Sequence, residues 1–216
     1  MVDFTLWDIF RNLLLAARWT VALSLIAFVG GGAVGLALLI ARIAKLPGAE
    51  RSVGLYVQLF QGTPLLMQLF LAYFGLALFG INVSPWVAAA LALTLYTSAF
   101  LAEIWRGCVA ALPKGQWEAA ASLALSPAQV FTRVVLPPAL QRVWPALVSQ
   151  IIIVMLGSAV CGQISTPELS YAANLIQSRN FRAFESFIVA TLIYLALSLL
   201  LRRLLNWAGP RFIFGR

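Results

Sequence analysis

Long uncharged stretches that are mostly apolar, separated by short charged segments, run along most of the chain. Four of them suit membrane crossing by length, at residues 19–41, 52–102, 143–167 and 186–201. A membrane-spanning helix needs about 20 such residues, so the second stretch has room for two crossings and each of the others for one. Lipid tolerates only helices or closed barrels, and barrel strands alternate apolar and polar residues. The unbroken runs therefore predict an all-α membrane protein with five transmembrane helices.

Turn residues divide the long second stretch. The segment 80–85 is typical of a tight turn, with Ser84 as N-cap and Pro85 in the first helical position. The Gly-Thr-Pro at 62–64 is an earlier break, and we expect residues 53–61 before it to form a short interfacial helix. Residues 1–216 then form a single transmembrane domain, with spans at about 19–41, 64–80, 85–105, 143–165 and 185–202.

Composition and charge support a membrane protein and predict its orientation. Charged residues make up 10% of the chain, whereas soluble domains carry about a quarter. Eleven of the 15 Lys and Arg residues fall on the side that holds 42–51, 106–142 and the C-terminal tail, and four on the other side. Because cytoplasmic loops are rich in Lys and Arg, we expect the N-terminus outside and the C-terminus in the cytoplasm. The net charge of +8 is thereby explained without nucleic acid as a partner.

The chain carries little catalytic chemistry. It has no histidine, and Cys108 and Cys161 are far apart without a metal-binding or redox spacing. No phosphate-binding loop or nucleophile elbow occurs. We therefore expect a chain that is not an enzyme and that binds no metal or cofactor of its own.

The cytoplasmic segment 106–142 is more organised than a simple connector. Residues 117–125 are strong helix formers, and Ser126, Pro127 and Gln129 form a capping box that begins a second helix. We expect the Leu-Pro-Pro at 136–138 to break the chain before the fourth crossing. Two interpretations remain open on these grounds. The hairpin is a docking element for a partner protein, or it is an amphipathic hairpin that rests on the bilayer.

Four motifs in order give the chain a resemblance to a known family. They are Gly-Thr-Pro-Leu-Leu-Met-Gln at 62–68, Ala-Glu-Ile-Trp-Arg-Gly at 102–107, Leu-Pro-Lys-Gly-Gln-Trp-Glu-Ala-Ala at 112–120 and Val-Leu-Pro-Pro-Ala at 135–139. The chain resembles the permease subunits of ABC importers, and more narrowly the polar amino-acid uptake group (histidine, glutamine and glutamate permeases). The similarity runs over roughly residues 10–205.

The resemblance implies a fold, a location and partners. The fold would be that of a type I ABC importer permease in the bacterial cytoplasmic (inner) membrane, with 106–142 as its EAA coupling loop. Two ATPase subunits would hold ATP and Mg, an extracytoplasmic solute-binding protein would deliver a polar amino acid, and membrane lipids would surround the spans. A second permease subunit would complete the path. The alternatives are an ATP-independent carrier and a non-transporting or asymmetric assembly subunit of such a complex.

The resemblance also implies functional residues. The residues expected to couple to the ATPase are Gly115, Gln116, Glu118, Ala119, Ala120, Leu123 and Ala124. Those expected along the translocation path or its gate are Gln61, Thr63, Pro64, Glu103, Arg106, Gly157 and Ser158.

Three departures from the family pattern affect these expectations. Gln61 stands where relatives usually have Arg, and Ala124 stands where they have a loop glycine. Leu156 and Gly157 lie where the family often carries Lys and Asp or Asn, which suggests a plainer wall and a partner permease that is a related but different chain. The sequence Ala-Phe-Glu-Ser-Phe at 183–187 is similar to glutamate/aspartate permeases, which favours acidic cargo.

Several residues carry two interpretations. Arg106 lies three positions after Glu103 on one helix face, so the two form either a structural ion pair or part of a gate. The hydroxyls of Thr63 and Ser158 face the path or bond to nearby backbone. Gly31 and Gly35 are typical of close helix packing. Glu168 caps a helix at its start or contacts the binding protein.

Overall fold

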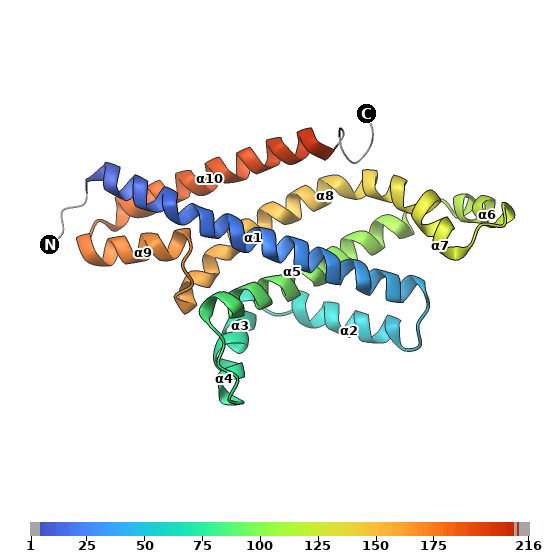
Figure 1. Ribbon diagram of the computed structural model, residues 1–216, viewed down its shortest axis with the longest axis horizontal. Helices are drawn as coiled ribbons and strands as arrows, with labels where there is room; N and C mark the ends of the chain where they lie inside the picture. The colour runs from blue at the N-terminus through green and yellow to red at the C-terminus, as the bar shows by residue number, and fades with distance from the viewer. Residues whose placement is uncertain (1–4, 210, 212–216) are drawn as a thin grey trace.

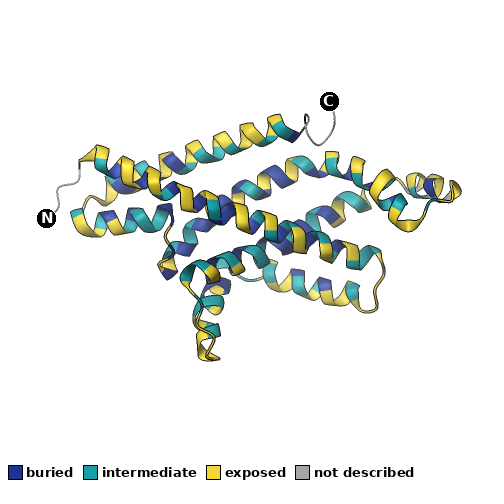
Figure 2. Ribbon diagram, viewed as in Figure 1, coloured by how far each residue is buried: buried dark blue, intermediate teal, exposed yellow. Residues whose placement is uncertain are grey.

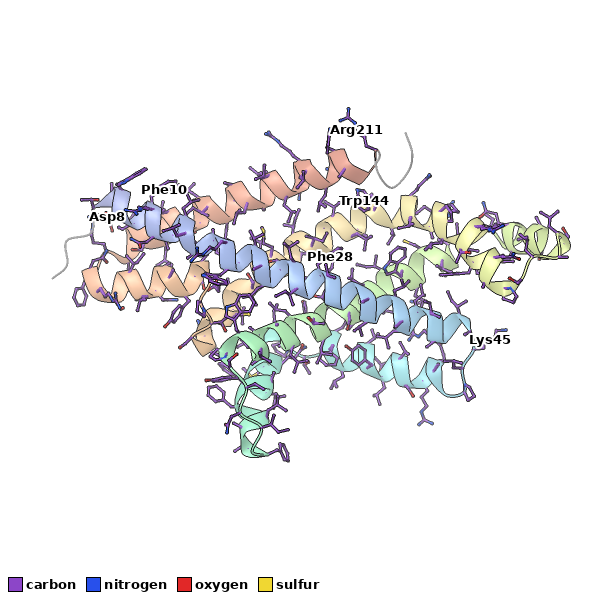
Figure 3. The ribbon with its side chains drawn as sticks, in the orientation of Figure 1. Asp8, Phe10, Phe28, Lys45, Trp144 and Arg211 are labelled. Carbon is purple, nitrogen blue, oxygen red and sulfur yellow. The ribbon has the colours of Figure 1, made fainter. Side chains whose placement is uncertain are left out.

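The computed structural model describes residues 5–209 and residue 211, and in it helices joined by short turns form an elongated bundle (Figure 1). Helix α1 (Leu6–Ile43) runs the length of the bundle, with Asp8 and Phe10 near one end and Lys45 just beyond the other (Figure 3). The hairpin of α6 (Lys114–Ser122) and α7 (Pro127–Gln129) lies at the end opposite the N-terminus. The all-helical class expected from the sequence is confirmed.

Helix α1 is much longer than the predicted first span of 19–41. It begins at Thr5, whose hydroxyl accepts the Asp8 N–H at 3.2 Å while the Asp8 carboxylate accepts the Thr5 N–H at 3.1 Å, a capping box. The sequence prediction began the first span directly after Arg18, but helix α1 already includes that residue. A charge limits how deep a helix sits in lipid, but it does not by itself end the helix.

The predicted break at 62–64 is confirmed, and the second span bends there. Helix α2 (Ala49–Gln61) is followed by α3 (Leu65–Phe70), the π-helical η1 (Leu71–Gly75) and α4 (Leu76–Leu78), and the axis turns by 102° between α2 and the rest. Helix α2 packs along α5 (Pro85–Ala110) through its buried residues Val53 and Val57, while Leu55 and Leu59 are 68% and 57% exposed. The interfacial position expected for residues 53–61 stays a prediction. The Tyr56 hydroxyl lies 2.6 Å from the Ser98 Oγ of α5 and 3.1 Å from the Leu95 carbonyl oxygen.

Helix α5 (Pro85–Ala110) follows the predicted start closely. Ser84 caps it by accepting the Val87 N–H at 3.3 Å, and Pro85 occupies the first turn, as expected. Helix α9 (Leu169–Asn180) and helix α10 (Ala183–Ala208) complete the chain.

The predicted break at 136–138 is wrong. Helix α7 (Pro127–Gln129), the π-helical η2 (Val130–Val135), α8 (Leu136–Gly157) and the 3-10 helix η3 (Ser158–Ile164) form one continuous helical segment. A proline in an α-helix lacks an N–H and clashes with the carbonyl four residues earlier. The wider turn of η2 directly precedes Pro137 and Pro138, and this geometry lets the helix pass them without a break.

Four helical segments of the described residues are long and apolar enough to cross a membrane, and the bent pair α2 with α3–α4 makes five. Buried residues gather where α1, α5 and α8 pack together, whereas α10 and α4 expose much of their surface (Figure 2). At the end of α4, Leu78 is 87% exposed and Phe79 83% exposed. An apolar surface of this extent is expected of a chain that lies in lipid.

Close contact between α1 and α5 is built on glycine. A Cβ added at Gly31 would lie 2.7 Å from the Thr97 Cβ, and one at Gly35 would lie 3.0 Å from the Ser98 carbonyl oxygen and 3.1 Å from the Ala102 nitrogen. Small residues let helix backbones approach in lipid, where no hydrophobic force drives them together. The packing interpretation of this glycine pair is confirmed.

Replacing Gly35 by alanine is expected to destabilise the protein by about 1–3 kcal/mol, because the new methyl meets rigid backbone atoms of α5. The matched control is Gly32→Ala, whose nearest atom would be the Leu101 Cδ1 at 3.9 Å, an ordinary contact. The control should unfold at the wild-type temperature or slightly above it. Thermal unfolding of the purified protein in detergent measures both, and equal midpoints for the two variants would contradict this account of the contact.

Candidate functional site

An ion-pair network joins α1 and α5 near the α1–α2 turn. The Arg42 Nη1 of α1 lies 2.7 Å from the Glu103 Oε1, and the Arg106 Nη2 lies 2.7 Å from the Glu103 Oε2. The Arg106 Nε donates to the same Oε2 at 2.8 Å. The predicted Glu103–Arg106 pair therefore exists, and each carboxylate oxygen of Glu103 is engaged by a different arginine.

Arg42 has a further neighbour on α2. Its Nε lies 3.7 Å from the Glu50 Oε2, which is close enough for an ion pair but too far for a hydrogen bond. The Arg42 side chain is 9% exposed, while that of Glu50 is 83% exposed. Within the described part of the chain, the Arg42 Nε is buried without a hydrogen-bond acceptor.

These side chains border a polar cavity of about 710 Å³ between α1, α2 and α5. This volume falls within the roughly 300–1,000 Å³ typical of small-molecule sites. Its charged and amide side chains are Arg42, Glu50, Arg51, Gln58, Gln61, Glu103 and Arg106. An arrangement with arginines and glutamates side by side can bind a ligand that carries both signs of charge.

Three of the residues predicted for the path or gate line this cavity, namely Gln61, Glu103 and Arg106. The Gln61 Nε2 also donates to the Ala99 carbonyl oxygen of α5 at 3.3 Å. The structure thus brings together the polar members of the predicted set that come from α2 and α5.

The other four predicted path residues lie at the joint between α2, α3 and the end of α8. The Thr63 hydroxyl donates to the Leu59 carbonyl at 2.7 Å, and the buried Ser158 hydroxyl donates to the Met155 carbonyl at 2.7 Å. Pro64 is the N-cap of α3, and a Cβ on Gly157 would lie 3.4 Å from the Leu65 Cδ2. Both hydroxyls therefore bond to backbone of their own helical segment, the second of the two interpretations given above.

The segment 106–142 forms a hairpin with its own small core. Helix α6 (Lys114–Ser122) packs on η2 through Ala120, and Leu112, Val130 and Val135 lie in the same core. Ser126 and Gln129 form the predicted capping box. The Arg142 Nη1 of α8 donates to the Ala111 carbonyl at the end of α5 at 2.7 Å, which ties the base of the hairpin to the bundle.

Most residues predicted to couple to a partner face outward from this hairpin. The exposed ones are Gly115, Gln116, Glu118, Ala119, Leu123 and Ala124. Ala120 is the exception and corrects the sequence prediction. It is 2% exposed and packs in the core of the hairpin, so its small side chain serves the contact between α6 and η2.

Ala124, which stands where the family has a glycine, adopts a φ of 54°. This left-handed conformation is unfavourable for an L-residue and costs roughly 1–2 kcal/mol. The turn between α6 and α7 is therefore left-handed at an alanine, although glycine adopts this conformation without steric cost.

Sequence reasoning missed Arg42, Glu50 and Arg51 as site residues. One available signal was that Arg42 ends the first apolar stretch on the same side as Glu103, so both lie at a similar depth. That signal does not specify which faces of α1, α2 and α5 meet, and those contacts depend on tertiary packing.

A second buried polar cluster surrounds Glu168 at the start of α9. Glu168 accepts the N–H groups of Ser170 at 2.9 Å and Tyr171 at 2.6 Å, so the predicted capping role is confirmed. The Tyr194 hydroxyl of α10 donates to it at 2.7 Å. Burial raises the pKa of Glu168, and these hydrogen bonds oppose the rise. The cluster ties α9 to α10.

Comparison with known proteins adds independent information. Residues 33–214 match the family described as binding-protein-dependent transport system inner membrane component. The probable amino-acid ABC transporter permease protein YckA of Bacillus subtilis (strain 168) is 31% identical over 207 residues, covering 91% of this chain and 92% of the relative. The probable glutamine ABC transporter permease protein GlnM of the same strain is 33% identical, with 89% of each chain covered.

A solved structure is similar over the whole fold. The crystal structure of an amino acid ABC transporter with histidines superposes with a TM-score of 0.88 at 31% identity, covering 98% of this chain and all of the other. The bent second span and the continuous helical segment from Pro127 to Ile164 therefore belong to a fold that occurs in this class of transporter.

Replacing Ala124 by glycine is expected to stabilise the hairpin by about 1 kcal/mol, because glycine adopts a positive φ without steric cost. Hydrogen exchange of the amides in residues 112–139 measures the change. The matched control, Ala119→Gly, lies in α6 and should destabilise the hairpin by roughly 0.5–1 kcal/mol. Slower exchange in the first variant and faster exchange in the second is the expected pair of results; changes of the same sign would contradict the left-handed turn.

Proposed function

Because the chain belongs to the family of binding-protein-dependent transport system inner membrane components, as a multi-pass amino-acid ABC transporter permease, we propose that it conducts a polar amino acid through an ATP-driven importer. A solute-binding protein on the outer side delivers the amino acid, and ATPase subunits on the cytoplasmic side drive the cycle. The single observation that carries this proposal is the hairpin at 106–142, which is exposed at its tip and braced at its base.

The hairpin has the mechanical properties that coupling requires. It has its own core, so it moves as a unit, and Arg142 connects its base to the end of α5. Glu118 is exposed on α6 and offers a carboxylate to a cation on an ATPase. ATP changes the conformation only if the hairpin docks differently in the two states, since a ligand with equal affinity for both shifts nothing. Two ATPase subunits, each with ATP and Mg, are the partners of this surface.

A second permease subunit covers the projecting arm. The segment Leu65–Leu78 leaves α2 at 102°, and its side chains Leu71, Phe74 and Leu78 are 70%, 55% and 87% exposed. An apolar arm that leaves its own bundle suits a contact with a neighbouring subunit. The apolar Leu156 and Gly157 favour a related but different chain, which would supply the polar groups that this chain lacks.

The cargo is a polar amino acid, and glutamate and aspartate are the first candidates. Support comes from the similarity of residues 183–187 to glutamate/aspartate permeases. Relatives named for glutamine make it the next candidate. Uptake of labelled amino acids by proteoliposomes that hold the whole importer distinguishes these cargoes.

A non-transporting or asymmetric assembly subunit is the second candidate function. The observation that favours it is Ser158, whose buried hydroxyl is bonded to its own helix and is not presented to a path. Under this alternative the partner permease alone lines the amino-acid site.

From the positive-inside count we expect the α6–α7 hairpin in the cytoplasm and the N-terminus outside. In a variant without native cysteines, a cysteine at Asn82 should react with an impermeant maleimide added outside intact cells. A cysteine at Gly115 should react only after the membrane is opened. Labelling of the second site in intact cells and protection of the first would reverse the orientation.

Glu118→Arg is expected to reduce co-purification of the ATPase more than tenfold, because it replaces an exposed carboxylate on α6 by a cation. The control Gln141→Arg adds the same group at an exposed position of α8 and should retain the ATPase. Uptake should fall in parallel with ATPase binding. An importer with Glu118→Arg that retains its ATPase and full uptake would refute the docking role.

A further inference from the structure

The short stretch between η3 and α9 is a junction at which several helices are joined by hydrogen bonds. The Leu169 N–H donates to the Thr20 hydroxyl of α1 at 3.0 Å. The Thr166 hydroxyl donates to the Pro85 carbonyl at the start of α5 at 3.2 Å. Thr20 and Thr166 are both fully buried. The junction is therefore anchored in the interior of the bundle.

Glu168 and its neighbours connect this junction to η3 and to α10. The Glu168 carboxylate, in a residue that is 1% exposed, accepts the Tyr194 hydroxyl of α10 at 2.7 Å and the Ser170 N–H at 2.9 Å. The Ser170 hydroxyl donates to the Ala159 carbonyl of η3 at 2.8 Å. A Cβ on Gly162 would lie 2.9 Å from the Glu168 Oε1, so η3 packs directly against the carboxylate. These contacts form a continuous chain from η3 through Glu168 to α10.

One continuous helical segment connects the Glu168 cluster with the hairpin. The segment Pro127–Ile164 begins at the capping box of the hairpin and ends beside the start of α9 (Figure 1). Rigid helices and packed, hydrogen-bonded groups carry coupling between distant sites. The hairpin is the surface proposed above to dock the ATPase, so a displacement of the hairpin reaches the Glu168 cluster along this segment.

Helix α10 is the element at the other side of the cluster, and the bundle holds it loosely. Three of its 26 residues are buried, namely Ser186, Ala190 and Ile193, and most of its surface is exposed (Figure 2). An element with few buried contacts separates from its neighbours at low free-energy cost. The hydrogen bond from Tyr194 to the buried carboxylate therefore has a large share in keeping α10 in step with the rest of the bundle.

We propose that the Glu168 cluster is a pivot that passes the displacement of the segment Pro127–Ile164 to α10, with Tyr194 as the positioning residue on α10. This inference rests on the proposed function, because it concerns how an ATPase docked at the hairpin moves helices away from the hairpin. Loss of the Tyr194–Glu168 bond releases α10 while the docking surface stays intact. ATP hydrolysis then continues, but fewer amino acids are moved for each ATP.

The test compares uptake with ATP hydrolysis in proteoliposomes that hold the complete importer with its binding protein. Uptake from a mixture of the radiolabelled protein amino acids and release of phosphate are measured together, and their ratio gives the amino acids moved per ATP. Tyr194→Phe removes the α10 hydroxyl, whereas Glu168 still caps α9. Uptake should fall at least fivefold, with hydrolysis within twofold of the wild type. Ser170→Ala removes the bond to the Ala159 carbonyl and should lower the ratio at least twofold.

Tyr171→Phe is the matched control. It removes a tyrosine hydroxyl from the same region, but Tyr171 reaches Glu168 through its backbone N–H at 2.6 Å, which phenylalanine keeps. The control should retain the wild-type ratio. A wild-type ratio in Tyr194→Phe would overturn the proposal, even if uptake and hydrolysis fall together, because a cluster that only stabilises the fold gives that result. If Tyr194→Phe does not assemble, Ser170→Ala decides by the same criterion.

Uptake by the wild type separates this inference from the proposed function. If the wild type takes up amino acids and the cluster variants keep its ratio of uptake to hydrolysis, the pivot is wrong and the function stands. If the wild type takes up no amino acid, the proposed function itself is wrong.

Discussion

The approach of α1 to α5 is the contact on which the rest of the bundle depends. Lipid gives helices no hydrophobic reason to associate, so close van der Waals packing supplies the force. Gly31 and Gly35 admit Thr97 and the backbone around Ser98 to distances that any larger residue would prevent. Two helical turns beyond Gly35 lies Arg42, and this crossing brings it within 2.7 Å of Glu103 on α5. A buried arginine is acceptable there because a carboxylate pairs with it.

The same helix α5 connects the cavity with the hairpin. Glu103 and Arg106 line the cavity from the last turns of α5, and α5 ends at Ala110. The next residue, Ala111, accepts the hydrogen bond from Arg142 that braces the hairpin. The hairpin and the cavity are thus connected by about two turns of one helix, through packed and hydrogen-bonded groups. A continuous connection of this kind is able to carry a displacement of the hairpin to the cavity.

Local signals predicted the parts of the structure that depend on local physics. The caps at Ser84, Ser126 and Glu168 and the Glu103–Arg106 pair require only residues three positions apart or fewer, and all are confirmed. The break at 62–64 was predicted, but its angle of 102° and the passage of the helix through Pro137 were not, because both depend on what packs around these sites. Ala120 was expected among the coupling residues from the resemblance, and its burial depends on the contact between α6 and η2. The coupling and path roles of the remaining residues stay predictions.

The way polar groups are satisfied in this bundle distinguishes structural residues from binding residues. Serine and threonine hydroxyls bond to backbone carbonyls of their own helical segments, as at Ser24, Thr63 and Ser158. Such groups need no ligand. Among the buried polar atoms that lack a hydrogen bond in the described chain, the Arg42 Nε is the one that belongs to a charged group. The charge of Arg42 is nevertheless paired, because its Nη1 lies 2.7 Å from the Glu103 Oε1. The Arg42–Glu103 pair is therefore a structural link between α1 and α5.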